Sequence, residues 1–108
     1  PPGIFEVVAA HSLPAPGTAA VQGTVSEPVG RNLALMHRVY LDDISPGNEV
    51  ARTTQPPSFF PAGVTPFSIT TPFAGGLPGQ TILGRLGVFD VDAGFTTLYD
   101  VAEPIGIV

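Results

Sequence analysis

The sequence contains no cysteine, no tryptophan and no lysine, and only 12% of its residues are charged. Without cysteine the chain has no disulfide, no thiolate metal ligand and no cysteine nucleophile. Four arginines against nine acidic residues give a net charge of −5, which disfavours sequence-independent binding to phosphate backbones or anionic membranes. No apolar run approaches the roughly 18 residues of a membrane-spanning helix. We therefore expect neither a nucleic-acid partner nor a membrane partner.

Proline and glycine are abundant instead, with 13 of each in 108 residues. In a helix interior proline costs about 3 kcal/mol and glycine about 1 kcal/mol, so the chain cannot be mostly helical. Hydrophobic residues make up 44% of the sequence, which together with the low charge opposes disorder. The composition predicts an all-β protein with a single small domain.

Period-two alternation and turn residues predict seven or eight short strands, which is typical of a β-sandwich or small β-barrel. The clearest hairpin joins 38–44 to 49–54 across the turn 45–48. The longest stretch without Gly or Pro begins after Gly30, and Asn32 is a suitable N-cap, which predicts at most one short helix over 33–38. The other expected strands are 19–25, 64–70, 80–91, 95–101 and 105–108.

Two features divide the chain into an extended N-terminal arm, 1–18, and a β domain, 19–108. The arm holds the apolar cluster 4–10 between proline-rich segments. The segment 55–79 holds six prolines and four phenylalanines, and because proline cannot donate to a central ladder we expect edge strand and loop there. Exposed apolar residues of both segments would suit contacts with other subunits. The predicted partner-binding residues are Ile4, Phe5, Val7, Val8, Phe59, Phe60, Phe67 and Phe73.

The sequence offers few candidates for a metal or cofactor site. Asp90-x-Asp92-x-Gly94 begins like a calcium loop, but its twelfth position is Val101 where a bidentate Glu is needed. His11 and His37 are the only histidines, and two isolated histidines do not supply the four ligands of zinc. We expect no metal and no cofactor.

Catalytic motifs are also missing. Asp42 and Asp43 are adjacent in a predicted strand and therefore point to opposite faces, so they do not form a carboxylate pair with each other. The glycine-rich segment 74–79 lacks the lysine of a phosphate loop, and there is no Gly-x-Ser-x-Gly nucleophile elbow. We expect no enzyme; Asp43, Asp90 and His37 would be the best catalytic candidates if they converged.

Three stretches resemble the head decoration, or cement, proteins of tailed phages: Gly79–Leu86 with its Gly-Gln-Thr-Ile-Leu-Gly-Arg-Leu order, Tyr99-Asp100, and the closing Pro104–Val108. The resemblance implies a trimer seated on the capsid surface of the virion, bound to the major capsid protein, with an N-terminal arm laid across the shell.

Softer motifs resemble the YbaY-type lipoprotein domain related to secretion pilotins: 21–25, 39–45, 66–69 and Pro104. That resemblance implies a non-catalytic β-sandwich in the periplasm or cell envelope. The low charged fraction of 12%, against about 25% for an ordinary soluble domain, favours surface hidden in contacts. We therefore expect a non-enzymatic structural protein that binds and stabilises a larger assembly, with an envelope accessory domain as the alternative.

Overall fold

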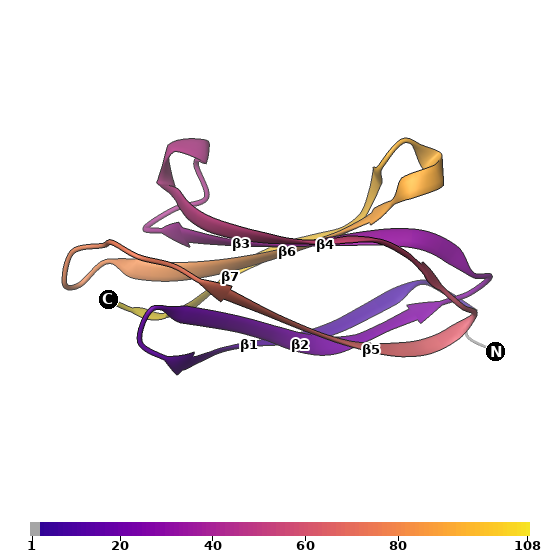
Figure 1. Cartoon of the computed structure of the whole chain (residues 1–108), viewed down its shortest axis with the longest axis horizontal. Helices are drawn as coiled ribbons and strands as arrows, with labels where there is room; N and C mark the ends of the chain where they lie inside the picture. The colour runs from indigo at the N-terminus through magenta and orange to yellow at the C-terminus, as the bar shows by residue number, and fades with distance from the viewer. Residues whose placement is uncertain (1–2) are drawn as a thin grey trace.

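The computed structural model describes residues 3–108 as two facing antiparallel β-sheets, shown in Figure 1. The all-β prediction is confirmed, and the architecture is an open sandwich and not a closed barrel. The three-stranded sheet has the order β1-β2-β5, and the four-stranded sheet has the order β4-β3-β6-β7. The strands are β1 (Glu6–Ala15), β2 (Thr18–Glu27), β3 (Arg31–Leu41), β4 (Glu49–Phe60), β5 (Gly63–Pro72), β6 (Thr81–Asp90) and β7 (Thr96–Ile107), with 3₁₀ turns η1 (Pro46–Asn48) and η2 (Val91–Ala93).

The sandwich has two distinct ends. The start of β1 and the labelled C-terminus lie at opposite ends of the long axis in Figure 1. The N-terminal end gathers the β2–β3, β4–β5 and β6–β7 turns, because Arg31 at the start of β3 pairs with Phe60 of β4 and lies two positions from the Leu33–Asp90 pair. The C-terminal end gathers the β1–β2, β3–β4 and β5–β6 connections. Compared with a constant-type immunoglobulin sandwich, the fourth strand pairs with the third strand and so belongs to the opposite sheet.

Strict alternation on the central strands builds the core. In β3 every second side chain from Leu33 to Leu41 is buried between the sheets. The buried apolar residues form two clusters. The larger, toward the N-terminal end, comprises Val21, Val25, Leu33, Leu35, Phe60, Phe67, Ile69, Leu86 and Val88, and the smaller comprises Ala19, Val39, Leu41 and Ile82.

Proline position separates outer strands from inner ones. Each of the four outer strands β1, β4, β5 and β7 contains proline, whereas the inner strands β2, β3 and β6 contain none. Proline lacks the N–H that an inner strand must donate, so it is restricted to edges and bulges. The expectation that 55–79 supplies edge strands is confirmed, since it contributes the second half of β4 and all of β5. The six strand prolines are Pro14, Pro56, Pro57, Pro66, Pro72 and Pro104.

The predicted arm is part of the sandwich, which corrects the division into 1–18 and 19–108. Pro1 and Pro2 lie outside the described residues, but β1 pairs with β2 from Glu6 opposite Ser26 to Ala15 opposite Thr18. The inward side chains of this strand, such as Val7, pack against the larger core cluster. An apolar face that meets the core makes the segment an edge strand of the domain.

Two further expectations were wrong. The segment 33–38 is strand and not helix, because its apolar residues recur every second position and both of its neighbours, β4 and β6, pair with it. The two strands expected at 95–101 and 105–108 are one strand, β7, which runs through Pro104 because an outer strand tolerates the missing donor. The hairpin of 38–44 with 49–54 and the strand over 64–70 are confirmed, as β3–β4 and β5.

Candidate functional site

The eight predicted partner-binding residues separate into three groups. Phe60 and Phe67 lie in the core with only 3% and 8% of their surface exposed, so they are not available to a partner, which corrects the prediction for these two. Both lie at inward positions of their strands, β4 and β5, so their side chains pack between the sheets. Phe5, Val7 and Phe73 are partly buried against the core clusters. Ile4, Val8 and Phe59 are exposed.

The N-terminal end of the sandwich exposes five large apolar side chains, which we call the apolar end: Ile4, Val29, Phe59, Val64 and Phe95. They come from the chain start, the β2–β3 and β6–β7 turns, the end of β4 and the beginning of β5. Val29 is 75% exposed and Phe59 is 63% exposed. The Phe59 ring lies over Gly30, where a Cβ would come within 2.9 Å of it and where φ is +94°, a backbone conformation that favours glycine. Phe95 also has a left-handed backbone, with φ of 57°, which is strained for a bulky residue.

A buried carboxylate fixes the β2–β3 turn beneath the apolar end. Glu27 has no exposed surface, and it accepts hydrogen bonds from the Val29 and Gly30 amides at 2.9 Å and from Arg31 Nε at 2.6 Å. Burial raises the pKa of Glu27, but these three donors outweigh it and the net pKa is lowered. The carboxylate therefore stays ionised and holds Val29 in its exposed position. Arg31 also reaches the Asp90 carboxylate, at 3.4 Å.

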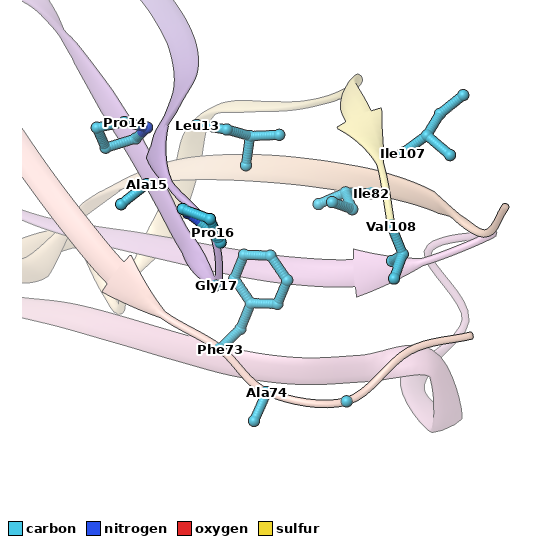
Figure 2. Close-up of a pocket in the computed structure, with 11 residues that line it drawn as sticks. Leu13, Pro14, Ala15, Pro16, Gly17, Phe73, Ala74, Ile82, Ile107 and Val108 are labelled. Carbon is cyan, nitrogen blue, oxygen red and sulfur yellow. The ribbon is translucent and has the colours of Figure 1, made fainter. Parts of the chain in front are cut away.

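The C-terminal end is hollowed by an apolar groove of about 730 Å³. The β1–β2 turn, the loop after β5, the start of β6 and the last two residues line it. Figure 2 shows the Phe73 ring pointing into the space between Leu13, Ile82 and Val108. The lining residues include no titratable side chain, so the groove suits an apolar segment and offers no acid–base chemistry.

A chain of polar side chains crosses the sandwich interior, and sequence reasoning missed it. Glu103 Oε1 lies 2.8 Å from His11 Nδ1, and His11 Nε2 lies 3.1 Å from His37 Nε2, with the two rings stacked at 5.1 Å. The His37 Nδ1 atom lies 2.8 Å from the hydroxyl of Thr71, which donates to Thr53 at 2.9 Å. The histidines are 26 residues apart and on different sheets. Their only sequence signal is that each lies at an inward position of a strand.

This polar chain separates the two core clusters, because His37 lies between Leu35 and Val39 on β3. Room for the His11 ring comes from Gly84, where a Cβ would approach the ring within 2.5 Å. Burial first, and then the charge on His11, lower the pKa of His37 to about 4. At neutral pH His37 is therefore an uncharged hydrogen-bonding link between the sheets.

The predicted acidic and histidine candidates do not converge. Asp43 follows β3 at the C-terminal end, Asp90 closes β6 at the N-terminal end, and His37 is buried midway between them. Asp90 and Asp92 bind different partners, Arg31 and Asn32 respectively. Within residues 3–108 no three His, Asp or Glu side chains gather in a way that could hold a metal ion. The helical turns of the same residues are too short to cross a membrane.

Comparison with known proteins gives the fold alone. The sequence matches no protein-family model and no curated protein. Among solved structures the sandwich is similar to part of a β-glucuronidase from glycoside hydrolase family 2, with a TM-score of 0.64 and 12% sequence identity. The match covers 95% of this chain and 11% of that enzyme, so the chain spans about a tenth of its length. The likeness defines the class as a β-sandwich domain.

Proposed function

We propose that this chain is a non-enzymatic structural domain that binds and stabilises a larger protein assembly. The observation that supports this proposal is the apolar end, where five large apolar side chains are exposed on a chain with only 12% charged residues. Exposed apolar groups gathered at one place usually mark a contact with another protein. Glu27 and Arg31 hold the turn beneath Val29, so this surface is formed before any partner arrives.

The specific form of the proposal is a decoration protein on a phage capsid, a trimer bound to the major capsid protein in the virion. The resemblance of Gly79–Leu86 and Pro104–Val108 to cement proteins supports this form, and these stretches overlap the paired strands β6 and β7. A periplasmic or envelope accessory domain is the alternative and carries no expectation of a trimer.

Side-chain substitutions test the proposal better than removal of residues 1–17, because β1 covers the core and its loss would unfold the domain. We expect the wild-type chain to sediment at micromolar concentration with about three times its mass of 11.1 kDa. The double variant Val29→Ser, Phe59→Ser removes two exposed apolar groups of the apolar end and should sediment as a monomer. The matched control Ile44→Ser, Leu77→Ser removes two exposed apolar groups elsewhere and should behave as the wild type.

The capsid form requires a second measurement. When shells of a tailed-phage major capsid protein are sedimented, the wild-type protein should appear in the pellet with them and the Val29→Ser, Phe59→Ser variant should stay in solution. Wild-type protein that stays monomeric and leaves the shells bare would overturn the proposal. If the wild-type chain forms a trimer but does not bind the shells, the proposal of an assembly protein stands and its capsid form is refuted.

A further inference from the structure

Three of the four arginines form a row across the outer face of the four-stranded sheet. Arg38 of β3 lies opposite Arg52 of β4 on one side and opposite Arg85 of β6 on the other. Directly opposed side chains share a sheet face, with Cβ atoms about 4.5–5.5 Å apart, and like charges at such positions destabilise the sheet. Repelling cations thus lie side by side in a chain whose net charge is −5.

Two carboxylates flank the row, and both are engaged by the outer arginines. Glu49 accepts two hydrogen bonds from Arg52, at 2.6 and 2.7 Å, and Asp100 accepts two from Arg85, at 2.8 and 2.7 Å. These hydrogen bonds are the largest cause of the lowered pKa of each carboxyl, so both are ionised at neutral pH. Three cations and two carboxylates leave the row with one positive charge in excess.

The excess falls on the middle arginine. The nearest carboxylate oxygen to Arg38 is Asp100 Oδ1, 3.9 Å from Nη2, which is too long for a hydrogen bond. The Arg38 Nε atom is shielded from solvent and has no hydrogen-bond partner among the described residues. Tyr40 is also buried on this face, but it does not neutralise Arg38. Its hydroxyl accepts a hydrogen bond from Arg85, at 3.3 Å. The Arg38 guanidinium therefore lies between two hydrogen-bonded arginines, with its own Nε donor unpaired and Asp100 only as a long ion-pair partner.

An apolar pocket of about 320 Å³ adjoins the row, lined by Ala34, Leu35, Met36, Thr54, Phe89 and Phe95. Met36 and Thr54 lie opposite each other, two residues along their strands from the Arg38–Arg52 pair. The Arg52 Nη1 atom lies 3.7 Å from Met36 Sδ, so the cationic row and the pocket wall are in contact.

We propose that the arginine row and the adjoining pocket form a binding site for a small carboxylate that carries an apolar group, such as the anion of a medium-chain fatty acid. The planar guanidinium of Arg38 matches a carboxylate through two parallel N–H donors, and a bound carboxylate would neutralise the excess charge. The apolar group would lie in the pocket against Met36 and Phe89. The pocket volume is at the small end of ligand sites, which sets the size of the ligand.

Octanoate is the probe, with binding measured by calorimetry and by NMR of the arginine Nε–H signals. We expect saturable binding that shifts the Arg38 Nε–H signal, and affinity for 1-octanol at least about tenfold weaker, because the alcohol lacks the charged acceptor. Inorganic sulfate, which has no apolar group, should also bind at least about tenfold more weakly. No saturable octanoate binding at millimolar concentration, or equal affinity for octanol or sulfate, would overturn the proposal.

Variants distinguish a binding role from a structural one. Arg38→Met keeps the aliphatic part of the side chain and removes one of three repelling charges. The melting temperature should therefore stay the same or rise, while octanoate binding is lost. Gln22→Glu on the outer face of the other sheet makes the same change in net charge, from −5 to −6, and should bind octanoate as the wild type does. Arg52→Met provides a second test at the more exposed end of the row and should also lose affinity. Undiminished binding by both arginine variants would contradict the assignment.

Discussion

The buried histidine at the centre of the sandwich predicts a specific dependence of stability on pH. His37 has a pKa of about 4 in the folded chain, against an ordinary value of 6.5. Because the folded value is lowered, the unfolded chain binds more protons between these two values, and stability falls as pH decreases through this range. The stabilising effect is complete above pH 6.5 and is progressively lost toward pH 4.

The size of the effect follows from the two pKa values. Between pH 7.5 and pH 5 the unfolded histidine takes up nearly one proton while the folded one takes up about a tenth, which lowers the free energy of unfolding by about 2 kcal/mol. The window stops at pH 5 because ordinary Glu and Asp values, 4.5 and 3.8, lie below it. Carboxylates such as Glu27, whose folded pKa is lower still, destabilise the fold on protonation only under more acidic conditions.

Urea denaturation at the two pH values measures the difference, and variants assign it. His37→Gln should lower stability at pH 7.5 but remove most of the change between pH 7.5 and pH 5. His11→Gln should retain most of the change, because burial is the larger cause of the lowered His37 pKa and the charge on His11 is the smaller one. An equal loss of stability on acidification in the wild type and in His37→Gln would refute this reasoning.

Other predictions concern single positions and can be checked by urea or thermal denaturation. Glu27→Gln should destabilise the fold by about 3 kcal/mol, because the β2–β3 turn loses its charged acceptor; an unchanged urea midpoint would contradict this. Gly84→Ala should cost about 1–3 kcal/mol, since the new methyl group meets the His11 ring, whereas Gly47→Ala, with open space around it, should change stability by less than about 0.5 kcal/mol. Phe95→Gly should stabilise the chain by about 1 kcal/mol by relieving its left-handed backbone, and a lower melting temperature would show that its packing matters more.

The sequence was sufficient for the fold class and for strands whose pattern is local. Composition excluded a helical protein, and alternation along 80–91 and the Pro-Gly turn after Ser45 predicted β6 and the β3–β4 hairpin. The errors arose where a local signal competed with pairing. Asn32 can cap a helix in isolation, but two neighbouring strands pair with the segment that follows it.

The candidate sites were much less predictable, because they depend on register between distant strands. The contact of His11 with His37 requires β1 to lie against the four-stranded sheet at the level of Gly84. The alignment of Arg38 with Arg85 likewise depends on how β3 and β6 pair, over a separation of 47 residues. Neither contact involves a short sequence motif, so the spacing of residues along the chain could not have predicted it.

The placement of proline on every outer strand limits how this domain can meet other proteins. Each outer strand contains at least one proline, which has no main-chain N–H to offer to a neighbouring chain that would extend the sheet. Recognition must then depend on side-chain shape at the tips and faces of the molecule, which discriminates between partners more sharply than backbone addition does. The same lack of donors protects a chain of few charges from fibrous stacking when many copies are crowded together.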